Sequence, residues 1–183
     1  MQVIIQVEVS VEQSVEEEFQ RRVRPPERCG NCGTLATLTL LAYYSRYTTG
    51  VGGDPIRFWV ARFICDVCDL TTSCLPSFAQ PYRLAASATI EAYVEGERGR
   101  LDVQRLEGLL KRYVKRFGRW QHTLRGIVGS RFGRGPPKEN ATAFLRRAVA
   151  ACGSLAELTL RLVQEFATTC FGTYGCHQPS SPR

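Results

Sequence analysis

Aspartates and histidines are scarce in this sequence, which restricts the chemistry open to it. There are two histidines and only four aspartates, at positions 54, 66, 69 and 102. A two-metal nuclease needs several carboxylates that converge on its ions, whereas Asp66 and Asp69 lie within or beside a cysteine pair and Asp54 lies in a turn. The glutamates are gathered near the N-terminus or scattered along helical segments. The sequence therefore predicts a protein that is not an enzyme and has no small-molecule substrate.

Long apolar runs are also missing. No stretch approaches the roughly 20 consecutive apolar residues that a membrane helix needs. The N-terminus alternates apolar and polar residues and lacks the basic start and apolar block of a signal peptide. We therefore expect a cytoplasmic protein with no membrane partner. In a reducing compartment, its eight cysteines are better read as thiols or metal ligands than as disulfides.

The charge is positive and unevenly distributed. The formal net charge is +7, and 21 of the 24 basic residues are arginine. Residues 1–20 hold five glutamates and no lysine or arginine, whereas residues 98–134 hold eleven basic residues against Asp102 and Glu107. A phosphate-binding surface requires such a concentration of positive charge in one segment.

The N-terminal segment reads as a strand followed by a short helix. Residues 1–13 alternate strictly, with the period of two that a half-buried strand has. Ser14 and Glu17 fit the S-x-x-E pattern of a capping box, which predicts that a helix begins there. Pro25 and Pro26 then end it, because proline cannot donate a helical hydrogen bond.

Four cysteines form two C-x-x-C pairs, Cys29 with Cys32 and Cys65 with Cys68. Residues 35–47 and 56–64, between the pairs, are rich in threonine, aromatic and branched side chains, which favour strands. The glycine-rich segment TTGVGGDP between them supplies a turn. Two pairs joined by a hairpin predict a zinc ribbon, in which four thiolates hold one structural Zn²⁺ ion.

The cysteines also allow other interpretations. A redox C-x-x-C of the thioredoxin type needs one pair beside a βαβ pattern, which is missing here. Cys74 and Cys152 are expected to be small buried residues. A second metal site at Cys170, Cys176 and His177 would lack a fourth ligand, so the sequence leaves the roles of these residues open.

The spacing of apolar residues predicts helices in the second half of the chain. Residues 84–94 predict one helix. A second helix, capped by Asp102, carries an apolar stripe from Leu106 to Phe117 at helical spacing. Gly118 is expected to break it before a further helix at residues 119–128. Residues 140–151 and 155–168 predict two more helices, with Ser154 and Glu157 as a capping box for the last.

The basic residues of the second helix and its continuation have two interpretations. They can form the solvated face that most amphipathic helices carry opposite their core stripe. Alternatively they position DNA in a helix-turn-helix, since arginine matches phosphate and guanine well. We favour DNA binding, and the residues expected to contact it are Arg105, Lys111, Arg112, Lys115, Arg116, Arg119, Arg125, Arg131 and Arg134.

Several segments together resemble a family of short bacterial proteins with a zinc ribbon followed by helices, similar to the N-terminal DNA-binding part of insertion-sequence transposases. The resemblance is carried by VEVSVE, RPPERCGNCG, YYSRY, RFICDVCDLTTSCLPSFAQPYRL, the arginine-rich helices and FGTYGCHQP. It covers most of the chain, and residues 62–84 are its most specific part. It implies a ribbon and a helix-turn-helix that recognise DNA, with ligand roles on the four paired cysteines.

The combined prediction is an α+β fold in which an N-terminal strand and a zinc-ribbon β-hairpin precede an all-helical bundle of helix-turn-helix type. The expected divisions are an N-terminal strand, helix and ribbon over residues 1–82, a basic helical segment over 83–134, a helical pair over 135–170 and a tail over 171–183. The expected function is DNA binding without a catalytic domain, beside a partner transposase or a second copy of the chain. The alternative is a zinc-ribbon adaptor for protein or RNA, which would expose aromatic residues of the hairpin such as Tyr43, Tyr44, Phe58 and Trp59 as a stacking surface. An enzyme with an unrecognised site is a weaker alternative.

Overall fold

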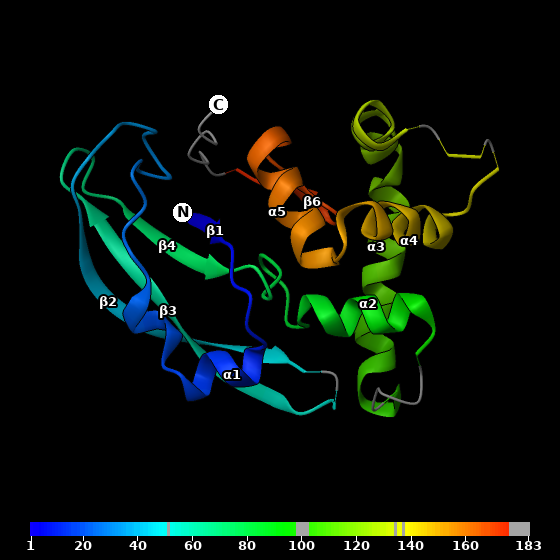
Figure 1. The fold of residues 1–183 in the computed structure, drawn as a ribbon, viewed down its shortest axis with the longest axis horizontal. Coiled ribbons are helices and arrows are strands. Elements are labelled where there is room, and N and C mark those ends of the chain that lie inside the picture. The colour runs from blue at the N-terminus through cyan, green and yellow to red at the C-terminus, as the bar shows by residue number, and fades with distance from the viewer. Residues whose placement is uncertain (51, 98–102, 134, 137, 176–183) are drawn as a thin grey trace.

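The computed structural model describes residues 1–50, 52–97, 103–133, 135–136 and 138–175, and its architecture confirms the α+β class. A sheet forms one side of the molecule and the longer helices form the other (Figure 1). The sheet contains β1 (Gln2–Ile5), β2 (Leu38–Thr49), β3 (Pro55–Cys65) and β4 (Thr71–Pro76) in the order β1-β4-β3-β2. The helices are α1 (Val11–Glu16), α2 (Ser87–Glu95), α3 (Val103–Phe132), α4 (Ala141–Cys152) and α5 (Leu155–Phe166), and a 3₁₀ turn spans Phe19–Arg22.

The predicted hairpin between the cysteine pairs is confirmed. β2 and β3 pair antiparallel, with Leu38 opposite Cys65 at one end and Thr49 opposite Pro55 at the other. β4 pairs antiparallel with β3, and β1 pairs parallel with β4. β2 begins at the end of the sheet where β3 ends. The C-x-x-C segment that precedes β2 and the one that begins at the end of β3 therefore meet at that end.

The N-terminal strand is shorter than predicted, and the predicted capping box is wrong. β1 ends at Ile5, and α1 begins at Val11 behind Ser10. The Ser10 hydroxyl accepts from the Gln13 amide at 3.2 Å, and the Gln13 side chain accepts from the Ser10 amide at 3.0 Å. Glutamine closes a capping box as well as glutamate does, so the helix starts four residues before the predicted Ser14.

The predicted break at Gly118 is also wrong, because α3 runs without interruption through it. Glycine in a helix interior costs only about 1 kcal/mol relative to alanine. The apolar stripe continues beyond it, with Leu124 and Val128 buried in line with Leu110 and Phe117. Burial of that stripe outweighs the cost of one glycine, and no helix-turn-helix is centred at this position.

Residues 171–175 belong to the folded structure and not to a tail. The chain leaves α5 through β5 (Thr168–Thr169) and β6 (Gly172–Thr173), which form a short antiparallel hairpin. Phe171 and Tyr174 are each 2% exposed, and the Tyr174 hydroxyl donates to the carbonyl of Gln2. The hairpin therefore ties the end of the helical part to the first strand. Cys176 and His177 lie outside the described residues.

Three hydrophobic clusters of described residues hold the helices and the sheet. The first lies among α2 to α5 and includes Phe117 and Phe144. The second joins the sheet to α5 through Leu160. The third includes Phe58 of β3 and Leu75 of β4. Cys74 and Cys170 are buried in these cores. No helix of the described residues is long and apolar enough to cross a membrane.

Candidate metal centre and basic groove

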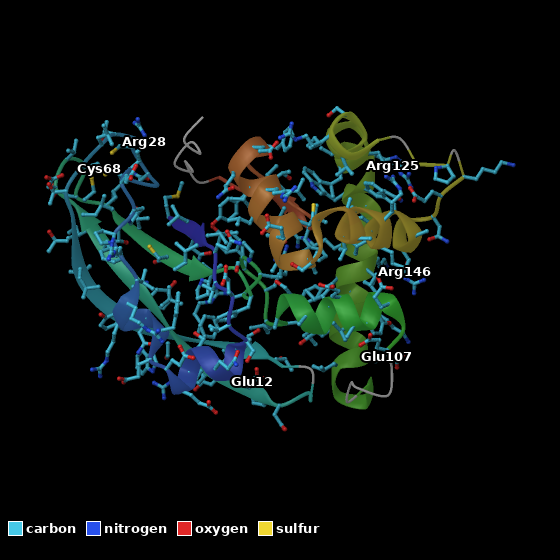
Figure 2. The ribbon with its side chains drawn as sticks, in the orientation of Figure 1. Glu12, Arg28, Cys68, Glu107, Arg125 and Arg146 are labelled. Atoms are coloured by element: carbon cyan, nitrogen blue, oxygen red, sulfur yellow. The ribbon has the colours of Figure 1, made fainter. Side chains whose placement is uncertain are left out.

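The four paired cysteines form a group that can hold a metal ion. The sulfurs of Cys29, Cys32, Cys65 and Cys68 all lie within 4.8 Å of one another. Cys29 and Cys65 are fully buried, and the second cysteine of each pair is half-buried. Figure 2 shows Cys68 at the end of the sheet that points away from the helices. The sequence-predicted ligands are therefore all brought together.

The two C-x-x-C segments have the same backbone hydrogen bonds, 36 positions apart in the chain. In the first, the Gly33 amide donates to the Cys29 carbonyl at 2.9 Å; in the second, the Asp69 amide donates to the Cys65 carbonyl at 3.1 Å. Gly33 and Asp69 both have positive φ, 72° and 55°. Each turn thereby brings its second thiol back beside the first.

Backbone amides also point at sulfur in both segments. The Asn31 amide donates to Cys29 Sγ at 3.3 Å, and the Val67 amide donates to Cys65 Sγ at 3.4 Å. The Thr72 hydroxyl lies 3.8 Å from Cys29 Sγ and accepts from the Gly30 amide at 3.2 Å. Such donors stabilise thiolate, which is the form that binds metal.

The thiols differ in acidity. Burial raises the pKa of Cys29, but backbone amides of Cys32 and Asn31 and the Thr72 hydroxyl outweigh it and lower the pKa to about 6. Hydrogen bonding from Thr34 lowers the pKa of Cys32. Burial raises the pKa of Cys65 to about 11, despite its amide donors. The Cys65 thiol is therefore less acidic than the Cys29 thiol, and both have to lose their protons to bind a metal ion.

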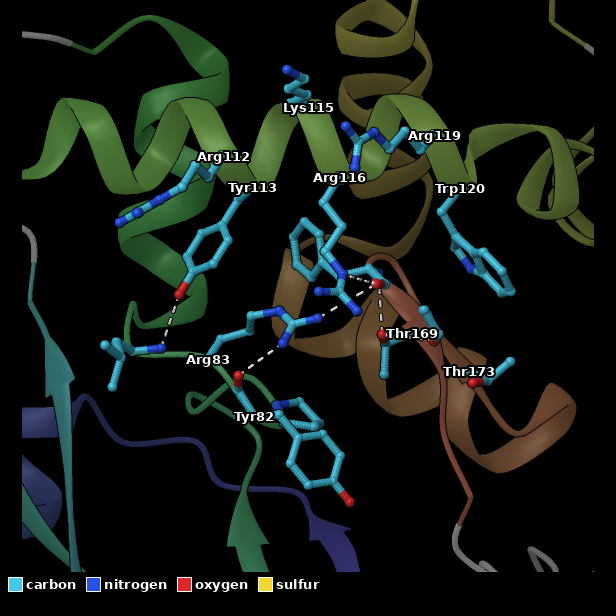
Figure 3. Close-up of a pocket in the computed structure, with 14 residues that line it drawn as sticks. Tyr82, Arg83, Arg112, Tyr113, Lys115, Arg116, Arg119, Trp120, Thr169 and Thr173 are labelled. Carbon is cyan, nitrogen blue, oxygen red and sulfur yellow. Dashed lines mark hydrogen bonds between the residues drawn. The ribbon is translucent and has the colours of Figure 1, made fainter.

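A second feature is a basic groove of about 1040 Å³ between α3, the loop after β4 and the β5–β6 hairpin. Figure 3 shows Arg116 of α3 and Arg83 of the loop pointing toward one another beside Thr169 of the hairpin, while Lys115 points away from this pair. We call the whole hollow the basic groove, and its lining residues are Pro81, Tyr82, Arg83, Leu84, Arg112, Tyr113, Lys115, Arg116, Arg119, Trp120, Thr169, Phe171, Gly172 and Thr173. Five of these described residues are cationic and none carries a carboxylate.

Four of the nine predicted DNA-contacting residues line the groove: Arg112, Lys115, Arg116 and Arg119. Three others are held by carboxylates elsewhere, since Lys111 lies 3.0 Å from Glu107, Arg125 lies 3.2 Å from Glu139, and Arg131 lies 3.4 Å from Glu165. The side chains of Arg105 and Arg134 lie outside those that the structure describes. The groove thus gathers four of the nine predicted residues, and DNA contact by any of the nine stays a prediction.

Arg83 joins the groove from outside the helix and was missed by the sequence prediction. Its Nη2 donates to the carbonyl oxygen of Phe171 at 3.4 Å, and Arg116 Nε donates to the same oxygen at 2.7 Å. The Arg83 guanidinium also lies 5.9 Å from the centre of the Phe171 ring. Burial, and the positive charge of Arg116, lower the pKa of Arg83. Two guanidinium groups are therefore held side by side at the groove floor.

The aromatic residues proposed for an adaptor surface are only partly exposed. Phe58 is 1% exposed and belongs to the core, while Tyr43 and Trp59 are 37% and 40% exposed. Arg57 lies over the Trp59 ring at 4.8 Å. Tyr43 and Trp59 line a shallow hollow beside the 3₁₀ turn. This surface is smaller than the predicted row of four aromatics.

Outside the groove, Glu139 is a buried carboxylate whose role is structural. Its side chain is 5% exposed and accepts from Arg147 Nε at 2.9 Å and from Arg125 Nη1 at 3.2 Å. Hydrogen bonds from Arg147, together with the charges of both arginines, lower the pKa of Glu139 from 4.5. These contacts fix the loop before α4 against α3.

Replacing Glu139 with glutamine should lower the free energy of unfolding by roughly 1–3 kcal/mol near neutral pH, because two partly buried guanidinium groups lose their carboxylate. The pKa of Glu139 is lower in the folded protein than its ordinary value of 4.5. Its ionised form therefore stabilises the fold above pH 4.5, and this stability is lost as the pH falls through the pKa of the folded protein. Urea unfolding of both proteins over a pH series should therefore show the difference shrinking below pH 4.5. Glu95→Gln, which breaks an exposed pair with Arg146, is the control. An equal difference at every pH would contradict the account.

Comparison of the chain with family models, with curated proteins and with solved structures gave no match. The resemblance to the N-terminal part of transposases therefore stays a prediction. Function has to be argued from the site itself.

Proposed function

We propose that this protein binds DNA through the basic groove and that the cysteine group holds a structural Zn²⁺ ion. The observation that carries the proposal is a groove with five cationic side chains and, among the described residues that line it, no carboxylate. Cations that a carboxylate already neutralises gain little from a phosphate, whereas unneutralised cations in a concave surface attract polyanions strongly. The groove cations fit the phosphates of a nucleic acid backbone.

The choice of zinc rests on the donor set. Four thiolates suit Zn²⁺ in a tetrahedral site, and an all-cysteine site leaves no open position for a substrate. The matched amide–sulfur hydrogen bonds of the two segments support that reading. The metal then contributes stability to the sheet and takes no part in chemistry.

A relation to transposases would make the chain a DNA-binding accessory without a catalytic domain, acting beside a partner transposase or as a homo-oligomer. The absence of carboxylates from the lining of the basic groove supports the noncatalytic part of this proposal. Its target would be the end of a transposable DNA element or another DNA structure.

The proposal is tested by the salt dependence of binding. A fluorescein-labelled DNA is titrated with the zinc-loaded protein, and anisotropy is followed at several salt concentrations. Five phosphate contacts predict a slope of log K against log [salt] of about −3.5 to −4.5, since each contact contributes about −0.7 on single strands and −0.9 on a duplex. A flat slope, or no binding at the lowest salt, would contradict it.

A second candidate is the adaptor function. The hollow at Tyr43 and Trp59 favours it, because half-exposed aromatic side chains are common at protein interfaces. Trp59→Ala should then abolish partner binding and leave DNA affinity unchanged.

A further inference from the structure

We infer that the basic groove takes single-stranded DNA in preference to a duplex, an inference that rests on the DNA-binding function proposed above. The first observation is the setting of α3. A helix that reads duplex DNA must protrude far enough to enter the major groove, which is about 12 Å wide. The groove-facing side of α3 does not protrude in this way, because the β5–β6 hairpin lies against it. Arg116 on that side donates a hydrogen bond to the Phe171 carbonyl in the hairpin.

The loop after β4 lies against α3 from the other side of the groove. The Leu84 amide donates to the Tyr113 hydroxyl at 2.9 Å, which holds the loop after β4 against α3. A duplex presents a wide convex surface, so we expect it to reach the exposed Arg112 and Arg119 but to contact the half-buried Arg83 less well than a single strand does. A single strand is narrower than a duplex and can lie along Arg83 and Arg116 at the floor.

Arg83 and Arg116 at the groove floor can bind one phosphate, and we call this pair the phosphate site. Arg83 and Arg116 share the Phe171 carbonyl as acceptor, and none of the described residues around them supplies a carboxylate. Arg83 Nε is buried without a hydrogen-bond acceptor among the described residues, and Arg116 is exposed. A phosphodiester next to the pair offers the negative charge that the two neighbouring guanidinium groups lack.

Aromatic side chains flank this phosphate site. Tyr82 is 61% exposed, and its φ of 56° is uncommon for a residue other than glycine. Its ring is supported by that of the buried Tyr174, with 6.3 Å between centroids. On the α3 side, Trp120 is half-buried, and its Nε1 donates to Thr168 Oγ1 at 3.2 Å, which fixes the indole.

A groove that combines cations with aromatic side chains is suited to single strands, since the cations bind the phosphates and unpaired bases stack on the rings. In a duplex the bases are stacked on one another and cannot reach Tyr82. The aromatic rim therefore adds affinity only for an unpaired strand, and this difference sets the preference. Stacking is tolerant of sequence, so a homopolymer is a sufficient probe.

The experiment compares an oligo-dT of about 12 nucleotides with a mixed-sequence duplex of equal length by anisotropy, on the zinc-loaded full chain. We expect the single strand to bind at least about ten-fold more tightly. Tyr82→Ala should weaken oligo-dT binding by about 5- to 100-fold, leave the salt slope unchanged and leave duplex binding unchanged. Tyr82→Phe should retain the affinity, because phenylalanine also stacks. Tyr47→Ala, which removes an exposed tyrosine on β2, is the matched control.

The outcomes separate this inference from the function on which it rests. Duplex binding as tight as single-strand binding, or an unaltered Tyr82→Ala, would overturn the single-strand inference and leave DNA binding standing. A strong preference for oligo-rU over oligo-dT would overturn the choice of DNA. Failure of every nucleic acid to bind at low salt would remove the proposed function itself.

Discussion

Replacing Cys65 with serine should abolish metal binding and unfold the sheet. The four sulfurs lie within 4.8 Å of one another at the end where β2 begins and β3 ends. A structural zinc ion of this kind contributes binding free energy of order 10 kcal/mol to folding, which is comparable with the whole stability of a typical domain. Loss of one thiolate therefore removes enough free energy to unfold the part of the protein that depends on it.

The unfolding should spread from the metal site into the helical part. Ala61 and Phe63 of β3 share a core with Leu160 and Val163 of α5. When the strands separate, these α5 residues lose their cover, and the apolar surface that they bury is returned to water. We therefore expect the basic groove to lose its geometry as well, since β5 follows directly on α5.

Zinc content, circular dichroism and amide hydrogen exchange measure this effect. Wild type should carry one ion per chain, and a strong chelator should reproduce the Cys65→Ser phenotype in a manner that added Zn²⁺ reverses. Cys152→Ser is the matched control, because that thiol lies in α4 outside the cysteine group. Slow exchange of the β2 and β3 amides after complete removal of the metal would show that the site is not structural.

Neutralising Arg112, Arg116 and Arg119 together as glutamines should weaken single-strand binding about 100-fold near 0.1 M salt. The reason is counterion release: each lost phosphate contact on a single strand reduces the magnitude of the salt slope by about 0.7, so three reduce it by about 2. All three side chains line the basic groove and are exposed, so the main cost in stability is the lost hydrogen bond from Arg116 to the Phe171 carbonyl, about 1 kcal/mol. Anisotropy titrations at several salt concentrations give both quantities.

A second triple variant controls for net charge. Arg21, Arg131 and Arg161 are each paired with a glutamate, at 3.0, 3.4 and 3.0 Å, and none lines the groove. Changing these three to glutamine alters the net charge by the same amount. Binding should fall much less than in the groove variant. Equal losses in the two triple variants would show that the protein attracts DNA only by its total charge.

The hairpin and the metal group were predictable because their signals are local. Two C-x-x-C pairs specify two similar turns, and the branched and aromatic residues between them specify paired strands. Once Leu38 is opposite Cys65, the four sulfurs have to meet. Ser154 was also a correct signal for the start of α5, because its hydroxyl accepts from the Glu157 amide at 3.1 Å.

The remaining features depend on tertiary contacts that a single sequence does not display. Gly118 looked like a break, but the stripe on α3 buries enough surface to carry the helix through it. Arg83 looked unremarkable in a loop, and only the fold places it beside Arg116, more than thirty residues away. The predicted basic set likewise could not be divided into free and paired residues before Glu139 and Glu165 were placed.

Chemical-shift mapping tests the central claim, that the basic groove is the DNA-binding site, most directly. ¹⁵N-labelled, zinc-loaded protein is titrated with oligo-dT, and the perturbed backbone amides are located on the structure. The account predicts that the largest changes fall on residues 82–84, 112–120 and 169–173, with the cysteine segments unaffected. Changes confined to the sheet, for example around Tyr43 and Trp59, with the groove unperturbed would contradict it.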